Sequence, residues 1–238
     1  MRIQKDSWIL NKPIAHRGLW GNGVPENSML AYQKATEKNY PIEIDIYLTK
    51  DDKIVSFHDS TLKRMTGADG NIWDYTYDEL KKLKLNGSEY TIPLLEDILA
   101  LCKGKSPLLI EIKNQPNNSI VDKAVEILKS YDGEFAVQSF NPLYIKRVKK
   151  IAPNFIRGIL ATPNAKQKSK FKNYVIKNMP LNFIIKPDFI SCEHNYYPLS
   201  KKKTKGKVLL AWTLTNKNAW DKVKPFVDNI IFENFTLD

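Results

Sequence analysis

Short apolar runs alternate with longer amphipathic stretches along almost the whole chain, and this alternation restricts the fold more than any other feature. Neither an internal repeat nor a low-complexity linker interrupts it. A helix between two strands carries the chain back to the same end of a sheet, so the strands pair in parallel. Eight strands are predicted, at Pro13–Arg17, Ile42–Leu48, Leu108–Lys113, Phe135–Ser139, Phe155–Leu160, Phe189–Glu193, Val208–Leu214 and Ile230–Glu233.

Helices are predicted between most of these strands, at Asn27–Lys38, Leu95–Cys102, Ile120–Tyr131, Pro142–Ile151, Asn164–Asn178 and Asn216–Phe226. The stretch between Asn195 and Lys205 has no clear helical pattern. Because only Phe235 to Asp238 follow the last strand, we expect the eighth covering helix to be absent or replaced by residues 1–11. Eight β/α units in 238 residues fit a TIM (β/α)8 barrel, and we expect a single domain over residues 1–238.

One segment departs from this rhythm after the second strand. Residues 49–52 have the composition of a tight turn, and Ile54–Phe57 then alternates as a returning strand, so a β-hairpin is predicted. The hairpin would bring His58 back over Glu43 and Asp45, at the carboxyl ends of the barrel strands. Residues 59–93, with a short helix predicted at Tyr77–Leu85, then form a small insertion after strand two.

The composition is that of a soluble globular protein, with 42% hydrophobic and 26% charged residues. The net charge is +11, and much of the excess lies at Lys166–Lys177 and in the lysine run at 201–207. Such basicity can attract nucleic acid, anionic lipid or phosphorylated substrates. No aromatic residue interleaves with the lysines at 201–207, which favours a solvated surface there, and no nucleic-acid partner is expected. The oligomeric state is left open.

The N-terminal residues contain no apolar run long enough for a signal-peptide core, and no run of about 18 apolar residues occurs elsewhere. We therefore expect a cytoplasmic protein without stable membrane insertion. Cys102 and Cys192 form neither a CxxC pair nor a disulfide framework. We predict that both are small core residues and that the chemistry does not use a thiol.

Charged side chains recur where predicted strands end, which is where β/α barrels place their catalytic groups. His16 and Arg17 end the first strand, and an imidazole beside a guanidinium suits a site that holds phosphate and moves a proton. Glu43 and Asp45 are spaced i and i+2 on the second strand, so both carboxylates face the same side. Two buried carboxylates on one face repel each other unless a cation lies between them.

Glu111 and Lys113 repeat this spacing on the third strand. Glu111 could complete an all-oxygen site for one divalent cation, Mg²⁺ or Ca²⁺, while Lys113 would offer a point charge to a phosphate. The alternative is a set of structural ion pairs between these carboxylates and the neighbouring Lys and Arg. The third histidine, His194, follows the sixth strand without a supporting motif, and a structural or peripheral role is expected.

Several segments resemble, in order and spacing, the motifs of the glycerophosphodiester phosphodiesterase family. They are Ala15-His16-Arg17-Gly18, Pro25-Glu26-Asn27-Ser28, Glu43-Ile44-Asp45, the run 57–64 that begins Phe57-His58-Asp59, Thr66-Gly67, Ile92-Pro93-Leu94-Leu95-Glu96, Glu111-Ile112-Lys113 and Gln138-Ser139-Phe140. The resemblance is dense over the first 140 residues and thinner afterwards, where Ala211-Trp212-Thr213 fits a late strand of the family. The chain departs from the family at Phe232–Phe235, where the family often has a Thr-Asp-x-Pro-like segment, and this departure bears on substrate preference more than on the chemistry.

The resemblance implies metal-dependent hydrolysis of glycerophosphodiesters to glycerol 3-phosphate and an alcohol. It also implies His16 and His58 as the acid/base pair, Glu43, Asp45 and Glu111 as metal ligands, Arg17 and Lys113 as phosphate contacts, and Glu26, Asn27 and Trp212 as further substrate contacts. Under this hypothesis the glycerol 2-hydroxyl attacks phosphorus, one histidine takes its proton and the other protonates the departing alcohol. A cyclic phosphate would form and then be opened by water.

Two other functions are kept as alternatives. A phospholipase of the C or D kind would act on lipid head groups, but residues 59–93 contain few clustered apolar side chains beyond Trp73, Tyr75 and Tyr77 that could form an apolar rim. A non-catalytic binder of phosphate ligands or nucleic acid could use the lysines, yet it would not need two histidines and three carboxylates. A product assay with soluble glycerophosphodiester and with intact lipid distinguishes the first alternative from the main hypothesis. An affinity that falls steeply with salt, without turnover, would support the second alternative.

Overall fold

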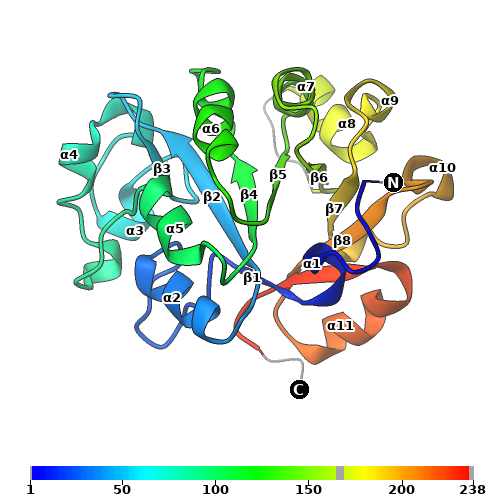
Figure 1. Ribbon diagram of the computed structural model, residues 1–238, viewed down its shortest axis with the longest axis horizontal. Coiled ribbons are helices and arrows are strands. Elements are labelled where there is room, and N and C mark those ends of the chain that lie inside the picture. Colours follow the sequence, from blue (N-terminus) through cyan, green and yellow to red (C-terminus); the bar gives the residue numbers. More distant parts are fainter. Residues whose placement is uncertain (1, 165–168, 236–238) are drawn as a thin grey trace. The chain divides into compact units, whose positions relative to one another are not determined.

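The structure is a computed structural model that describes residues 2–164 and 169–235 (Figure 1). Eight parallel strands form a closed barrel with intervening helices, which confirms the predicted TIM barrel. The ends of these strands lie within two residues of the predicted ones. The strands are β1 Ile14–His16, β2 Ile42–Leu48, β4 Leu108–Ile112, β5 Phe135–Ser139, β6 Arg157–Ala161, β7 Phe189–Glu193, β8 Val208–Leu214 and β9 Asn229–Phe232, and the additional β3 spans Ile54–Ser56.

Strand β2 is the element that positions the acidic residues. It is buried along its whole length, pairs in parallel with β1 and β4, and pairs antiparallel with β3. The register aligns His16 with Glu43, and Asp45 with Glu111. Neighbouring strands are about 4.8 Å apart, so aligned residues on one face have side chains in contact distance. Parallel pairing therefore brings functional groups from three segments to one place.

The predicted hairpin is also present. The Thr49 amide donates to the Lys53 carbonyl over 2.8 Å, and Asp52 adopts φ 62°, a left-handed conformation that Asp tolerates in turns. The chain then returns as β3, and the Phe57 amide donates to the Asp45 carbonyl over 3.0 Å. His58 thus follows directly after a residue that is hydrogen-bonded to β2.

The chain divides into two compact units, residues 15–135 and residues 136–238 with 1–14. The 15–135 unit contains β2, β3, β4 and most of β1. Its helices are α2 Met29–Glu37, α3 Lys63–Thr66, α4 Tyr77–Leu80, α5 Leu95–Cys102 and α6 Ile120–Lys129, with short 3-10 turns at η1 Ile72–Asp74 and η2 Leu85–Gly87. The predicted helix at 77–85 is thus shorter than expected, because it ends at Leu80.

The insertion at 59–93 has a hydrophobic core of its own, which the sequence analysis missed. Apolar side chains of the insertion are buried against three residues of β2 and the β3 segment; they are Leu62, Met65, Ile72, Leu80, Leu85 and Ile92 against Tyr47, Val55 and Phe57. The expectation of few clustered apolar side chains was therefore wrong, although these side chains form a core and no exposed rim. In Figure 1 the insertion, with α3 and α4, is drawn in cyan next to β3.

The 136–238 unit contains β6 to β9 and the remaining helices. These are α1 Trp8–Asn11, α7 Pro142–Ile151, α8 Lys170–Asn178, α9 Asn182–Ile185, α10 Lys201–Thr204 and α11 Lys217–Val223, with 3-10 turns at η3 His194–Tyr196 and η4 Lys224–Phe226. The start of the helix predicted at 164–178 lies partly outside the described residues. Asn229 on β9 donates its side-chain amide to the carbonyls of Ile9 and Lys12, so the N-terminal segment is held at the last strand as expected.

Both cysteines are buried and free, as predicted. Burial raises the pKa of the Cys102 thiol to about 11 and that of Cys192 to about 12. Both thiols therefore stay protonated at neutral pH and are poor nucleophiles. Within residues 2–164 and 169–235, no helix has the length and apolar character needed to cross a membrane.

Candidate active site

Three carboxylates meet on β2 and β4 in the 15–135 unit. Glu43, Asp45 and Glu111 are 2%, 1% and 7% exposed, and each offers an oxygen within 4.8 Å of the others. Buried carboxylates are rarely found unpaired, because removing their charge from water is costly. This geometry fits a divalent cation, since Mg²⁺ and Ca²⁺ are bound by oxygen ligands of this kind.

The charges around this cluster also favour a cation. Five carboxylates belong to the connected group, namely Glu26, Glu43, Asp45, Asp59 and Glu111, against the three permanent cations Arg17, Arg64 and Lys113. If all of them are ionised, two negative charges remain in excess. One divalent ion would neutralise that excess.

Asp45 is the most heavily contacted carboxylate. Lys113 Nζ lies 3.2 Å from Oδ1, while Arg17 Nε lies 3.5 Å and Asn27 Nδ2 3.0 Å from Oδ2. Burial alone would raise the pKa of Asp45, but the positive charges of Lys113, His58 and Arg17 outweigh burial and lower it far below its usual value. Asp45 is therefore an anion. The ion pairs foreseen as the alternative are thus present around the same three carboxylates.

Glu43 is in the opposite situation. Burial, followed by the negative charges of Asp45 and Glu111, raises the pKa of Glu43 well above its usual value. Without a cation Glu43 therefore tends to hold a proton. The lysine that balances the cluster is Lys113, which lies 3.0 Å from Glu111 Oε1. Burial works to lower the pKa of Lys113, yet Asp45 and Glu111 raise it above its usual value.

The turn after β1 positions His16 and Arg17. His16 Nε2 lies 3.9 Å from Glu43 Oε2, and the Arg17 amide donates to the Glu43 carbonyl over 3.0 Å. Gly18 follows with φ 81°, and a Cβ there would lie 2.7 Å from the Ala31 backbone. Only glycine fits this turn without strain, because both the dihedral angle and the close approach exclude a side chain.

His58 is held by a chain of charged groups. Its Nδ1 lies 2.7 Å from Asp59 Oδ1, and Arg64 Nε donates to Asp59 Oδ2 over 2.6 Å. Arg64 also contacts Glu26 Oε1 at 2.6 Å, and Glu26 in turn accepts from Arg17 over 2.8 Å. Hydrogen bonding to His58 lowers the pKa of Asp59 and, with Arg64, outweighs the opposing effect of burial.

A second, uncharged network fixes Asp45 from behind. The buried Tyr32 hydroxyl donates to Asn27 Oδ1 over 2.8 Å and lies 2.6 Å from Ser56 Oγ, which contacts the Asp45 carbonyl at 3.0 Å. Asn27 Oδ1 is thus occupied, so its amide nitrogen is turned toward Asp45. In sequence, Ser56 lies 24 residues from Tyr32 and 29 residues from Asn27.

The structure brings together nine of the ten predicted site residues. His16, Arg17, Glu26, Asn27, Glu43, Asp45, His58, Glu111 and Lys113 belong to one connected group in the 15–135 unit. Trp212 belongs to the other unit, where its ring meets Phe140 edge-on with centroids 5.8 Å apart. Asp59, Arg64, Tyr32 and Ser56 were missed as supporting residues. Asp59 and Arg64 stand in the quoted run at 57–64, which could have suggested them.

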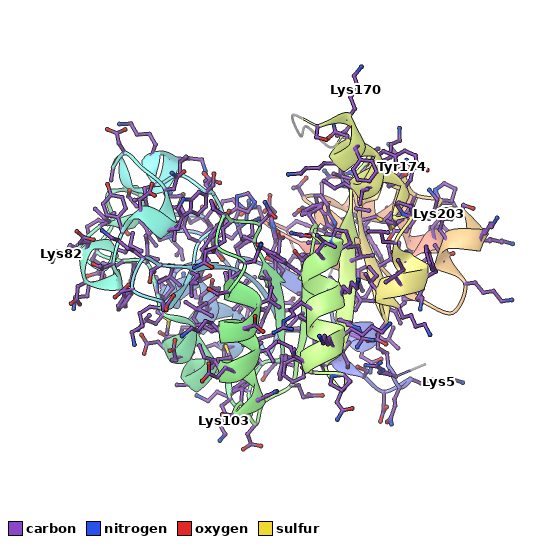
Figure 2. All side chains as sticks on the ribbon, turned by 90° about the horizontal axis from the view of Figure 1, so that it is seen from above. Lys5, Lys82, Lys103, Lys170, Tyr174 and Lys203 are labelled. Atoms are coloured by element: carbon purple, nitrogen blue, oxygen red, sulfur yellow. The ribbon has the colours of Figure 1, made fainter. Side chains whose placement is uncertain are left out.

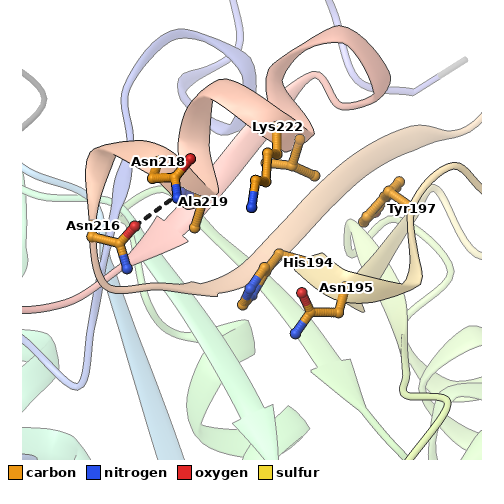
Figure 3. A pocket seen from close by; sticks show the side chains of 8 residues that line it. His194, Asn195, Tyr197, Asn216, Asn218, Ala219 and Lys222 are labelled. Carbon is orange, nitrogen blue, oxygen red and sulfur yellow. Dashed lines mark hydrogen bonds between the residues drawn. The ribbon is translucent and has the colours of Figure 1, made fainter.

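His194 lines a cavity of about 350 Å³ in the 136–238 unit. The other lining residues come from η3 and α11 and from the residues directly next to them, and they include Asn195, Asn216, Asn218 and Lys222. Figure 3 shows the Lys222 amine directed toward the side of the cavity where His194 and Asn195 lie. Nδ1 of His194 is buried without a hydrogen-bond partner among the described residues. The cavity is thus polar, and its basic side chains suit an anionic group.

Comparison with known proteins gives a consistent result. The profile of the glycerophosphoryl diester phosphodiesterase family matches residues 16–236. A glycerophosphodiester phosphodiesterase of Caldanaerobacter subterraneus is 32% identical over 241 residues, covering 93% of each chain. A lysophospholipase D of Homo sapiens is 34% identical over 144 residues, which cover 55% of this chain and 45% of that protein. A phosphodiesterase of Oleispira antarctica, solved with its product sn-glycerol-3-phosphate, superposes with a TM-score of 0.79, at 25% identity over 94% of this chain and 93% of that one.

Proposed function

This chain belongs to the glycerophosphoryl diester phosphodiesterase family and hydrolyses glycerophosphodiesters to glycerol 3-phosphate and an alcohol, and we propose that His16 and His58 are its acid/base pair. The observation that carries the proposal is the proximity of these two histidines to the buried carboxylates of β2. His16 lies 3.9 Å from Glu43, and both histidines contribute to lowering the pKa of Asp45. They therefore lie close to where a cation-bound phosphate would be.

We infer that Glu43, Asp45 and Glu111 hold one divalent cation, Mg²⁺ or Ca²⁺. When bound, such an ion supplies Lewis-acid stabilisation of charge on the phosphate. The protein contributes the fixed positions of the three carboxylates. Asn27 and Lys113 contact Asp45 and restrict its rotation, so the ligand set is held in place before substrate arrives.

His58 is suited to proton transfer because Asp59 orients it. When Nδ1 donates to Asp59, Nε2 is left as the nitrogen that takes or gives a proton. In the proposed first step one histidine accepts the proton of the attacking glycerol 2-hydroxyl and the other protonates the departing alcohol oxygen. The P–O bond to the alcohol breaks as the P–O bond to the 2-hydroxyl oxygen forms. Water then opens the cyclic phosphate with the histidine roles exchanged.

Arg17 is the proposed phosphate contact with the most direct support. Its Nε is buried without hydrogen-bond geometry to any described residue, although Asp45 lies 3.5 Å away. A buried donor of this kind gains by meeting a phosphate oxygen. Lys113 would share that contact only by loosening its ion pairs with Asp45 and Glu111, so its first effect is to balance these carboxylates.

Glu26 and Asn27 act in this proposal as positioning residues. Glu26 accepts hydrogen bonds from Arg17 and Arg64, and Asn27 donates to Asp45. These contacts hold the Glu26 carboxylate against the two guanidinium groups and direct the Asn27 amide toward Asp45. Trp212 is retained as a proposed wall for the glycerol or alcohol group. A single domain over 1–238 and a cytoplasmic location stay predictions from the sequence.

The test is to incubate the purified protein with glycerophosphocholine and glycerophosphoethanolamine, with Mg²⁺, with Ca²⁺ or with EDTA, and to follow glycerol 3-phosphate by a coupled assay. We expect metal-dependent release that falls about 10²–10⁴-fold in His16→Ala and in His58→Ala. Near-normal turnover in either variant would exclude the substituted histidine from the acid/base pair. Equal turnover with and without metal would exclude a role for the cation in the reaction.

The second candidate substrate class is the lysophospholipids. It is favoured by the 34% identity over 144 residues to the human lysophospholipase D. The same assay with a lysophospholipid in place of the soluble diester distinguishes the two classes. Release of choline or ethanolamine from the lysolipid, without release of glycerol 3-phosphate from soluble diesters, would replace the first candidate.

A further inference from the structure

Helices α8 and α9 of the 136–238 unit expose large apolar side chains. Phe171 and Phe183 are each 74% exposed and Tyr174 is 55% exposed, while Ile184 is 36% exposed. None of the residues of helix α8 is fully buried. Single exposed apolar residues are common on protein surfaces, but two phenylalanines and a tyrosine in consecutive short helices are not.

The exposed residues of α8 lie on one face of the helix. With 3.6 residues per turn, Lys170, Phe171, Tyr174 and Lys177 fall within about a third of its circumference. Val175 and Ile176 point to the other side, where they line a small apolar cavity with Met179. Figure 2 shows Tyr174 on α8 and the Lys170 side chain extending away from the ribbon. The inner face thus packs, and the outer face presents aromatic rings between lysines.

Helix α9 is anchored in a way that leaves its aromatic ring outside. Ile185 is buried, and Lys149 on α7 donates its ammonium to the Ile184 carbonyl over 2.6 Å. Phe183 remains on the surface. We name Lys170, Phe171, Tyr174, Lys177, Phe183 and Ile184 the α8–α9 patch.

The segment that carries this patch contains no acidic residue. Between Phe135 and Pro187 the sequence has eleven Lys and Arg residues and no Asp or Glu. The charge of this segment, +11, therefore equals the net charge of the whole chain. The positive charge near the patch is therefore not neutralised by carboxylates of its own segment. A surface of this kind attracts anions over about a Debye length, roughly 10 Å in 0.1 M salt.

We propose that the α8–α9 patch docks the protein on the surface of an anionic phospholipid bilayer. Phe171, Tyr174 and Phe183 would enter the interface between head groups and acyl chains, while the lysines keep their ammonium groups at the level of the lipid phosphates. Attraction of the basic segment to anionic head groups adds to this burial. Such docking is reversible and needs no spanning helix.

Two other partners fit these observations less well. A second copy of the chain would bring two segments without acidic residues together, and their like charges would repel. Single-stranded nucleic acid could stack on aromatic rings, but Ile184 has no role in stacking. The basic residues of α8 are all lysines, and neither α8 nor α9 contains an arginine. Aliphatic and aromatic side chains among lysines are what a lipid interface selects.

The experiment is sedimentation of the full chain with phosphatidylcholine vesicles prepared with and without phosphatidylglycerol, in the absence of substrate. We expect binding only when phosphatidylglycerol is present, with an affinity that falls as salt is raised. The double variant Phe171→Ser/Phe183→Ser should bind at least about tenfold more weakly, because two aromatic rings no longer enter the interface. The double variant Lys170→Gln/Lys177→Gln should lose about tenfold or more in affinity for vesicles that contain phosphatidylglycerol.

Matched controls are available elsewhere on the chain. Phe226→Ser removes another exposed aromatic, 42% exposed on η4, and Lys82→Gln removes an exposed lysine of the insertion. Both controls should bind vesicles as the wild type does. Phe171→Trp keeps an aromatic ring in the patch and should bind vesicles as the wild type does. On vesicles its fluorescence emission should shift to the blue by more than that of the wild type, because the introduced indole ring enters the interface. Every patch variant should keep its hydrolysis of soluble diester, which checks folding.

Equal binding to vesicles with and without phosphatidylglycerol would overturn the proposal, as would patch variants that bind like the wild type. Binding to oligothymidylate but not to vesicles would assign the patch to nucleic acid instead. A dimer in solution that the phenylalanine variants dissociate would assign it to self-association. Because vesicle binding is measured without turnover, its failure is distinguishable from failure of the proposed acid/base pair.

Discussion

Two carboxylates on the same face of β2 are expected to respond differently when their charge is removed. Glu43 has a raised pKa, so its metal-free form is close to a neutral acid, and Glu43→Gln is nearly isosteric with that form. We expect this variant to keep the metal-free free energy of unfolding within about 0.5 kcal/mol of the wild type. A cation at 100 times its Kd stabilises the wild type by about 2.7 kcal/mol, and the variant should lose most of this gain.

Asp45→Asn should be costly without any metal. Its carboxylate contacts Lys113 and Arg17 and is 1% exposed, so the substitution leaves two largely buried cations with less compensation. Loss of one partner of a buried pair costs about 3 kcal/mol. Urea unfolding in EDTA measures both variants, and Glu126→Gln on the exposed face of α6 is the control. Equal destabilisation by the Glu43 and Asp45 variants would contradict this assignment of charge.

Asp59 is expected to act on His58 and not on the cation. Asp59→Asn should lower kcat about 10²-fold, because His58 loses the carboxylate that selects its tautomer. The metal-induced rise in stability should be unchanged, since Asp59 is not among the three clustered carboxylates. Asp69→Asn, on a side chain 90% exposed, is the control and should stay near wild-type activity. A loss of metal binding in Asp59→Asn would contradict the assignment of Asp59 to orienting His58 alone.

Asp59 should also contribute to acid sensitivity. Its pKa in the folded state is lowered, chiefly by the hydrogen bond with His58 and then by Arg64, so the unfolded state binds more protons as pH falls. Its stabilising contribution is present above the unfolded pKa, about 3.9, and is lost as pH falls below that value. The free energy of unfolding between about pH 5 and pH 3 should therefore fall more steeply in wild type than in Asp59→Asn, by urea titration at each pH.

The site could be predicted from sequence where chemistry and local spacing coincide. The i, i+2 pair Glu43 and Asp45 identified a shared face, and the hairpin placed His58 near β2, as the structure bears out. The supporting residues Tyr32 and Ser56 were not predicted. A tyrosine on a helix and a serine on a short strand give no local sign of meeting, since their contact depends on packing between segments.

At the level of elements, the insertion is expected to depend on its own core. Leu62 is fully buried and precedes α3, which carries Arg64 toward Asp59 and Glu26. Leu62→Ala should cost about 2–5 kcal/mol in the free energy of unfolding, because a buried leucine leaves a cavity. Leu143→Ala removes the same atoms from a side chain that is 62% exposed and should be nearly neutral. Comparable losses from both would mean that the insertion core contributes little.

The strands were predicted more accurately than this core because each of them concentrates apolar residues in one short segment. All eight barrel strands are three to seven residues long and contain at least two adjacent apolar residues, which a sequence shows directly. The insertion buries one or two residues from each of several very short elements, such as α3, η1, α4 and η2. Isolated apolar positions have no period, so neither helical nor strand patterns reveal that they converge.

For the whole molecule, the two compact units are expected to unfold together. Their boundaries, between Ile14 and Ala15 and between Phe135 and Ala136, fall inside strands β1 and β5 and not in linkers. Domain boundaries usually lie in exposed, flexible segments, because few hydrogen bonds are broken there. A cut through two strands argues that the units belong to one cooperative domain.

Fluorine NMR of protein labelled with 5-fluorotryptophan tests this without substitutions. Trp20 and Trp73 report on the 15–135 unit, and Trp8, Trp212 and Trp220 report on the other. All five resonances should lose intensity at the same urea concentration, and Mg²⁺ or Ca²⁺ should move all five midpoints equally, although the acidic cluster lies in one unit. If the cation raised only the midpoints of Trp20 and Trp73, the units would be separate domains, because stabilisation by a ligand extends only as far as cooperative unfolding does.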